Sequence, residues 1–277
     1  MTAPAVSLPT MERPIGMFDS GFGGLTVARA VIDLLPEEHL VYIGDTGRYP
    51  YGPRPQAEVR EFALQLAWSL VREHDAKAIV VACNTASAAA LDVLQDELPV
   101  PVIDVVQPGA RALVTATRSG EVGVIGTVGT IGSGAYERAV AATGATVHLT
   151  GAACPGFVEF VERGQTSGDE VTILAERLLA PVKEAGVDSL LLGCTHYPYL
   201  ARVISEVMGP DVTLVSSADE TAFVTRELLS AEGLLRASGG PSAEHHFLSS
   251  GDISWFADLG RRLLGPELRE AAQWTPG

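Results

Sequence analysis

The chain has 277 residues, 47% of them hydrophobic, which is enough to bury one large core or two ordinary ones. Its formal net charge of −15 repels polyanions and anionic lipid surfaces, so we expect neither nucleic acid nor a membrane as a partner. The three cysteines include no C-x-x-C pair, which argues against a disulfide framework and a structural metal.

Short β-branched runs alternate with amphipathic stretches along the chain. The predicted strands cover, in order, residues 15–19, 40–45, 78–84, 100–105, 122–127, 145–150, 189–195, 212–216 and 247–250. Helical stretches of roughly 10–18 residues separate most of these strands, and a further helix is predicted to start near Asp252. Such alternation is typical of the α/β class with mostly parallel sheets.

The pattern predicts two similar α/β domains with an active site in the cleft between them. We expect a flexible N-terminal tail over residues 1–14, a first domain over 15–103 plus 213–277, and a second over 104–212. A faint repeat supports like halves, because residues 15–21 resemble residues 122–128, which lie 107 positions further on. Chance similarity between two βα units remains an alternative.

Location and cofactor chemistry are constrained by what the chain lacks. No apolar run nears the roughly 18 residues of a membrane span, and residues 1–14 do not resemble a signal peptide, so we expect a cytoplasmic protein with reduced thiols. Only two of the 19 Lys and Arg residues are lysines, Lys77 and Lys183. Neither is placed like a Schiff-base lysine, which argues against pyridoxal phosphate, and both are predicted to be solvated surface groups.

Two cysteines, Cys83 and Cys194, each follow a predicted strand and precede a predicted helix, 111 positions apart. A thiol there lies at the carboxyl edge of a sheet, where α/β folds bind ligands, and near a helix N-terminus that favours its thiolate. Two thiols on opposite sides of a small ligand suit inversion at a carbon, because one can remove a proton while the other supplies one. A buried, inert cysteine is the alternative for each, but the polar neighbours Asn84, Thr85 and Thr195 argue against it.

Other candidate sites are weaker. The glycine-rich turn after the first strand, residues 19–24, invites nucleotide binding but lacks the third spaced glycine, and that hypothesis leaves both cysteine segments unexplained. Adjacent His245 and His246 invite a metal, yet neighbouring strand residues point to opposite faces. Cys154 has no polar partner motif and is predicted to be structural.

Four segments of the chain resemble the signature segments of bacterial glutamate racemase. In order they are Asp19-Ser20-Gly21-x-Gly23-Gly24, Asp45-Thr46 followed by Tyr49-Pro50-Tyr51-Gly52, Cys83-Asn84-Thr85-Ala86, and Gly193-Cys194-Thr195-His196-Tyr197-Pro198. Aspartate racemases share a two-cysteine arrangement, but usually carry an acidic residue where this chain has His196. The resemblance is therefore to the glutamate enzymes.

This resemblance implies a racemase that needs no cofactor and no metal, interconverts L- and D-glutamate, and supplies D-glutamate for peptidoglycan. It implies that Cys83 and Cys194 transfer the protons, with Asp19 assisting the first and His196 the second, and that Glu162 takes part near Cys194. The residues expected to contact substrate are Asp19, Ser20, Tyr51, Gly52, Asn84, Thr85, Thr195 and His196. A homodimer is also expected, although no sequence feature fixes its geometry.

Two alternatives come from other functional classes. A cysteine hydrolase could use Cys194 with His196, but residues two apart rarely let the imidazole reach the thiol and also find an orienting third group. A non-enzymatic amino-acid-binding module of periplasmic type is disfavoured because the chain shows no signal peptide.

Overall fold

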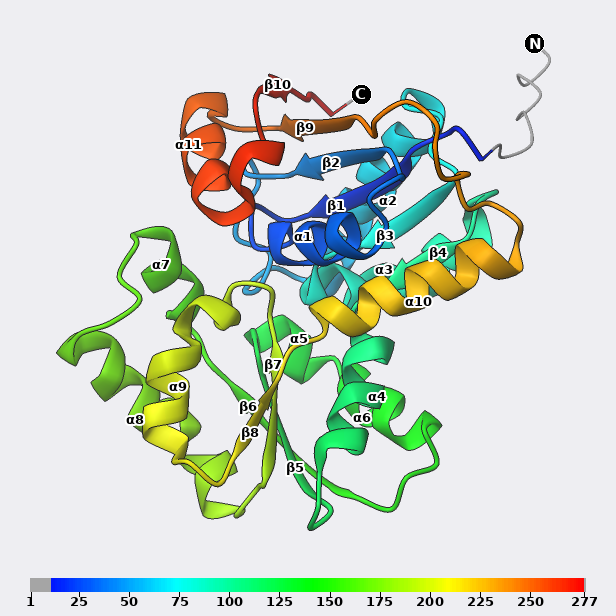
Figure 1. Ribbon diagram of the computed structural model, residues 1–277. Coiled ribbons are helices and arrows are strands. Elements are labelled where there is room, and N and C mark those ends of the chain that lie inside the picture. The colour runs from blue at the N-terminus through cyan, green and yellow to red at the C-terminus, as the bar shows by residue number, and fades with distance from the viewer. Residues whose placement is uncertain (1–10, 277) are drawn as a thin grey trace.

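Two parallel β-sheets, each covered by helices, make up the computed structural model, which describes residues 11–276 (Figure 1). The first sheet has the strand order β10 (Ala271–Gln273), β9 (His245–Ser249), β2 (Leu40–Gly44), β1 (Ile15–Asp19), β3 (Ala78–Val81), β4 (Val102–Asp104). The second has the order β6 (His148–Ala153), β5 (Glu121–Gly126), β7 (Ser189–Gly193), β8 (Thr213–Val215). The α/β class with parallel sheets is confirmed.

Eleven α-helices and two short 3-10 helices lie between the described strands. They are α1 (Leu25–Leu34), α2 (Gln56–Arg72), α3 (Asn84–Glu97), α4 (Val106–Ala116), α5 (Val128–Gly132), α6 (Ala135–Ala142), α7 (Phe157–Glu162), α8 (Asp169–Glu184), η1 (Tyr197–Leu200), α9 (Ala201–Met208), α10 (Ala218–Ala231), α11 (Ile253–Leu264) and η2 (Gly265–Glu267).

The central strands are apolar except for Asp19 at the end of β1, as expected where helices cover both faces of the sheet. Every residue of β1, β2 and β3 is buried, as expected for strands inside a parallel sheet. Alternate side chains enter different cores: Met17 packs with α1 and α11, whereas Phe18 packs with α2 and α3. Helices packed on both faces thus hold the sheet in place, and the carboxyl ends of its parallel strands form one edge.

The two halves have the same topology. The order β2-β1-β3-β4 in the first sheet corresponds strand by strand to β6-β5-β7-β8 in the second. The segment after β3 is therefore equivalent to the segment after β7, and the segment after β1 to that after β5. This equivalence confirms the prediction of two like halves.

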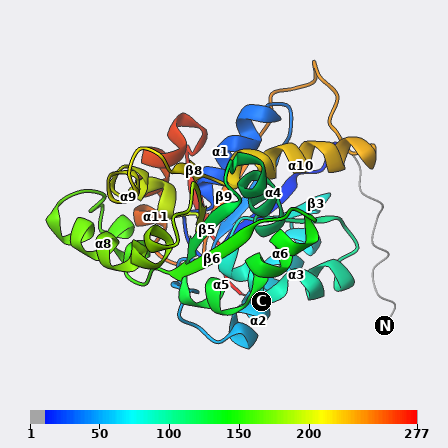
Figure 2. The same ribbon diagram turned by 90° about the horizontal axis from the view of Figure 1, so that it is seen from below.

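Helix α10 joins the halves. It contacts α1 of the first half and α4 of the second, and it lies along the junction of the two in Figures 1 and 2. After α10 the chain returns to the first sheet, where β9 pairs with β2. The segment that contains β9 therefore lies in the first sheet, beside β2.

Some boundaries differ from the sequence prediction. Strand β8 pairs with β7, so residues 213–215 lie in the second sheet, and Asp104 ends β4 of the first. Strand β10 was not predicted, because Ala271-Ala272-Gln273 carries no β-branched residue. The domain division otherwise stays a prediction, and most of the tail predicted over 1–14 lies outside the described residues.

The prediction for Lys77 is wrong. Its side chain is 0% exposed and forms an ion pair with Glu38, which is also buried. The ammonium group also donates hydrogen bonds to the carbonyl oxygens of Met11 (2.7 Å) and Leu234 (2.8 Å). Burial lowers the pKa of Lys77, and the carboxylate of Glu38 opposes that shift. The partners come from three distant segments, which a sequence pattern does not reveal.

Candidate active site

The carboxyl edges of both sheets border one small cavity of about 90 Å³. Its walls include the residues that follow five strands, namely Ser20 after β1, Cys83 after β3, Thr127 after β5, Cys154 after β6 and Cys194 after β7. Nine of the residues predicted for the site line it: Ser20, Tyr51, Gly52, Cys83, Asn84, Thr85, Cys194, Thr195 and His196. Parallel strands end at the same edge of a sheet, which explains why segments so far apart in sequence meet here.

Cys83 lies in the first half and caps a helix. Its Sγ accepts a hydrogen bond from the backbone N–H of Ala86 (3.4 Å) in the first turn of α3. Burial raises the pKa of the Cys83 thiol, and the nearby carboxylate of Asp19 adds to the rise, while hydrogen bonds from Ala86 and Ser20 oppose it. Together these effects favour the neutral thiol of Cys83.

Asp19 divides its two oxygens between structure and site. Oδ2 accepts hydrogen bonds from the backbone N–H groups of Gly21 (3.1 Å) and Gly24 (3.0 Å), and so holds the glycine-rich turn. Oδ1 is buried without a hydrogen-bond partner, although Asp19 is 0% exposed. A buried acceptor without a partner is costly. Asp19, although predicted for the site, does not line the cavity itself.

Cys194 lies in the second half beside a histidine. The Nδ1 atom of His196 is 3.9 Å from Sγ of Cys194, and its Nε2 atom is 3.3 Å from Oε1 of Glu162. Burial alone would lower the pKa of His196, but its contacts with Cys194 and Glu162, with the charge of Asp19, raise this pKa to about 10. A protonated imidazole at this position stabilises negative charge on the Cys194 sulfur.

We expected that residues two apart would rarely form such an arrangement, but Cys194 and His196 do form it. His196 reaches the thiol with one ring nitrogen and an orienting carboxylate with the other. The third group, Glu162, comes from the end of α7, which packs against η1 directly after His196. Glu162 does not line the cavity itself and acts on it through the imidazole.

Hydrogen bonds cross between the halves at the cavity. The hydroxyl groups of Thr85 and Thr127 are 2.9 Å apart, and both also contact the hydroxyl of Thr130. Asn84 donates from Nδ2 to the Tyr136 hydroxyl (2.6 Å), and Oδ1 of Asn84 is left buried without a partner. Sequence reasoning missed Thr127, Thr130 and Tyr136. The repeat offers one signal, since Thr127 is the counterpart of Ser20 at the end of the equivalent strand.

The hydroxyl of Tyr51 is directed to Asp45, which is fully buried. The same carboxylate accepts hydrogen bonds from Arg48 (2.7 Å) and Ser250 (2.6 Å). Asp45 therefore shapes the loop that carries Tyr51, and Ser250, which follows β9, supports it. Gly52 lies close to the second half, because a Cβ atom there would meet Cβ of Thr127 at 2.8 Å.

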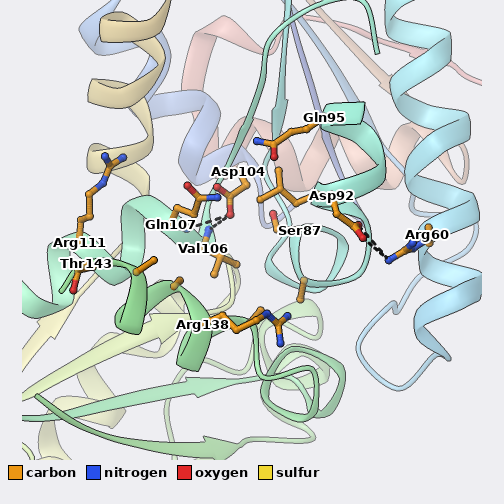
Figure 3. Close-up of a pocket in the computed structure, with 15 residues that line it drawn as sticks. Arg60, Ser87, Asp92, Gln95, Asp104, Val106, Gln107, Arg111, Arg138 and Thr143 are labelled. Atoms are coloured by element: carbon orange, nitrogen blue, oxygen red, sulfur yellow. Dashed lines mark hydrogen bonds and ion pairs between the residues drawn. The ribbon is translucent and has the colours of Figure 1, made fainter. Parts of the chain in front are cut away.

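A larger cavity of about 750 Å³ lies elsewhere between the halves, among α3, α4 and α6 (Figure 3). Its two carboxylates are occupied: Asp92 pairs with Arg60 at 3.2 Å, and Asp104 accepts from the N–H groups of Val106 (2.8 Å) and Gln107 (3.1 Å). It contains none of the residues predicted for the site. The small cavity with the cysteines is thus the candidate active site.

Metal and membrane features are absent from the part of the chain that the structure describes. Among residues 11–276, no group of three or more His, Cys, Asp and Glu side chains is arranged to hold a metal ion. Within the same range, no helix has both the length and the apolar character that a bilayer span requires.

Known proteins match the chain over most of its length. The Asp/Glu/Hydantoin racemase family model matches residues 25–223. A glutamate racemase of Parafrankia sp. is 56% identical over 255 residues, which cover 92% of each chain. A glutamate racemase isoform of Bacillus anthracis matches with a TM-score of 0.89 at 41% identity, over 95% of this chain and 97% of that one. The glutamate racemase of Francisella tularensis, solved in complex with D-glutamate, matches with a TM-score of 0.88 at 33% identity, over 96% and 98%.

Proposed function

The chain belongs to the Asp/Glu/hydantoin racemase family, and from this premise we propose that it interconverts L- and D-glutamate by proton transfer between Cys83, Cys194 and the α-carbon. One observation carries the proposal: the two thiols follow equivalent strands of two like halves and line the same cavity. Thiols from different halves can approach a bound α-carbon from different faces, which inversion of configuration requires.

The proposed reaction needs one thiolate and one thiol. In one direction the Cys194 thiolate removes the α-proton and becomes a thiol, the electron pair stays on the α-carbon, and Cys83 donates its proton to the other face and becomes a thiolate. The opposite direction reverses these roles. Burial raises the pKa of Cys83, and the raised pKa of His196 favours a cationic imidazole 3.9 Å from Sγ of Cys194, which supports this starting state.

The polar groups of the cavity suit an amino acid. Oδ1 of Asn84, on the cavity wall, and Oδ1 of Asp19, which does not line the cavity itself, are acceptors without a partner, and we assign them to the substrate ammonium group. Helix α3 starts at Asn84 on the cavity wall, and its first N–H groups can receive a carboxylate. The small volume supports a small-molecule substrate.

A cysteine hydrolase is the second candidate, because Cys194, His196 and Glu162 form a connected nucleophile, base and orienting group. That function requires no second thiol. The two candidates therefore differ in whether they need Cys83.

The test incubates the reduced protein with L-glutamate in D₂O without added cofactor and follows optical activity together with α-deuteration. Racemisation with deuterium incorporation is expected for the native chain, and a loss of at least about 100-fold is expected for both Cys83→Ser and Cys194→Ser. Cys154→Ala is the matched control: Cys154 also lines the cavity, but the proposed proton transfer does not use it and its Sγ donates only to the carbonyl oxygen of Ala152 (3.8 Å), so the variant should keep its activity. Full racemisation by Cys83→Ser would overturn the two-thiol mechanism.

We further propose a cytoplasmic enzyme that acts as a homodimer and supplies D-glutamate for peptidoglycan. Light scattering of the purified protein tests the dimer. Depletion of the protein in its host, with and without added D-glutamate, tests the role in the cell wall.

A further inference from the structure

The imidazole of His196 belongs to the second half, but three residues of the first half enclose it. The ring of Phe22 meets it edge-on, with centroids 4.8 Å apart and planes at 63°. The ring of Tyr49 lies on another side, at 6.4 Å and 30°. Gly23 completes the enclosure, since a Cβ atom there would lie 2.4 Å from Nδ1 of His196. His196 is only 2% exposed as a result.

Phe22 and Tyr49 are themselves held in place. Phe22 is 0% exposed and rests against Trp255 of α11, with ring centroids 5.6 Å apart. The hydroxyl of Tyr49 is buried without a hydrogen-bond partner, and the carboxylate of Glu162 lies close enough to add to the effect of burial in raising the pKa of Tyr49. Phe22 is thus fixed by its neighbours, and the ring of Tyr49, which is partly buried and packs against the core, forms the second surface beside the imidazole.

The Cys83 side of the cavity is built differently. Its neighbours Asp19, Ser20 and Ala86 all belong to the first half, as Cys83 does. No residue of the second half is needed to place the Asp19 carboxylate near that thiol. The two proton-transfer groups are therefore unequal: one is assembled within a half, and the other is assembled between halves.

We propose that Phe22 and Tyr49 are positioning residues that hold the His196 imidazole against Cys194, so that the second proton-transfer group is complete only when the two halves are closed on each other. This inference rests on the proposed racemase function and deepens it. A histidine side chain has two rotatable bonds, and the single contact with Glu162 does not fix the ring plane. The two aromatic walls and Gly23 leave the ring one orientation, with Nδ1 toward Cys194.

The proposal predicts an unequal effect on the two directions of the reaction. If the imidazole loosens, transfer at Cys194 slows and transfer at Cys83 does not. For the enantiomer that Cys194 deprotonates, removal of the α-proton then limits the rate, and its substrate deuterium isotope effect rises. For the other enantiomer, delivery of a proton by Cys194 limits the rate, and its substrate isotope effect falls. A smaller fraction of folded protein lowers the rates for both enantiomers and leaves both substrate isotope effects unchanged.

The experiment compares Phe22→Leu, Tyr49→Leu and Tyr49→Phe in the full chain, with α-deuterated L- and D-glutamate as substrates. We expect kcat to fall about 10- to 100-fold in Phe22→Leu and Tyr49→Leu, with isotope effects that diverge between the enantiomers. Tyr49→Phe keeps the ring and should stay within about twofold of the native kcat. Isotope effects that stay equal to the native values in both leucine variants would overturn the proposal.

A second readout does not depend on activity. The ring resonance of His196, assigned by its loss in His196→Gln, is followed by NMR in protein with ¹³C-labelled histidine. We expect it to shift and broaden in Phe22→Leu and Tyr49→Leu and to stay unchanged in Tyr49→Phe. If the native protein does not racemise glutamate but the leucine variants still show these NMR changes, the proposed function is wrong and the positioning role stands. An unchanged resonance in the leucine variants would remove the positioning role alone.

Discussion

Gly23 of the first half touches His196 of the second through its backbone alone, because a Cβ atom at Gly23 would lie 2.4 Å from Nδ1 of the imidazole and 2.6 Å from Oγ1 of Thr195. We therefore predict that Gly23→Ala displaces the imidazole from Cys194 and lowers kcat/KM by about 100-fold or more. Steady-state kinetics of racemisation checks this.

Gly132→Ala is the matched control, since no atom lies within 4 Å of a Cβ atom built at that position. It should leave kcat/KM unchanged and lower the unfolding temperature of the protein by no more than about 1 °C. Native activity in Gly23→Ala would show that the halves can close without this contact.

Tyr51 should matter for stability more than for chemistry. Its hydroxyl donates to the buried carboxylate of Asp45 instead of the cavity. We expect Tyr51→Phe to lower the free energy of unfolding by about 1.5–3 kcal/mol, typical of a hydrogen bond to a charged acceptor. We expect kcat to stay within about threefold of the native value. Denaturant unfolding and kinetics measured on the same sample test both parts. A 100-fold lower kcat at unchanged stability would mean that the hydroxyl meets the substrate.

The stability of the protein should depend on pH through His196. Its pKa is raised to about 10 in the folded chain, against an ordinary value of 6.5. The folded state then binds the proton more tightly than the unfolded state, so this stabilisation is complete below about pH 6.5 and is lost as the pH rises through about 10. The midpoint of urea unfolding should fall between pH 7 and pH 10.5 by more in the native chain than in His196→Gln. Parallel pH profiles of the two proteins would contradict the shifted pKa.

Lys77 should be a stability residue without a role in the reaction. Removing the ammonium group leaves Glu38 buried at 3% exposure, and breaking a buried ion pair in this way costs about 3–5 kcal/mol. We expect Lys77→Met to lose stability on this scale but to keep kcat below its unfolding temperature, because Lys77 lies at the end of β3 opposite to Cys83. If adding Glu38→Gln to the Lys77→Met variant restores the stability, the unpaired carboxylate of Glu38 is the cause of the loss.

Lys183→Met is the control for that substitution. Lys183 donates one hydrogen bond to the carbonyl oxygen of Val207 (2.7 Å) and is exposed, as the sequence predicts. Its loss should cost about 1 kcal/mol. A larger cost than for Lys77→Met would show that the Lys77 ion pair is not the stronger contact.

Much of the fold follows from local patterns. The strand predicted over residues 15–19 coincides with β1, and the other predicted strands overlap β2 to β9, because a strand inside a parallel sheet must be apolar on both faces. The cavity could be placed because polar residues follow those strands at a shared edge, as Cys83 and Cys194 do.

Contacts between the halves could not be predicted in this way. Which side chain of one half faces which of the other depends on how two finished domains pack, and no local pattern encodes it. Thr127 and Tyr136 were missed for that reason, although each forms a hydrogen bond to a predicted residue. Glu162 could be named only from family resemblance, because its partner His196 is 34 positions away.

The return of the chain to the first sheet sets an order for its synthesis on the ribosome. Strands β5 to β8 are contiguous in sequence, so the second half can pair its strands as soon as it emerges. Strands β1 to β4 of the first half are contiguous as well, but the edge of β2 stays open until β9 is made, and Asp45 lacks its contact with Ser250 until then. Since Asp45 also binds the hydroxyl of Tyr51, the support of that part of the cavity wall is complete only after residue 250 has been translated.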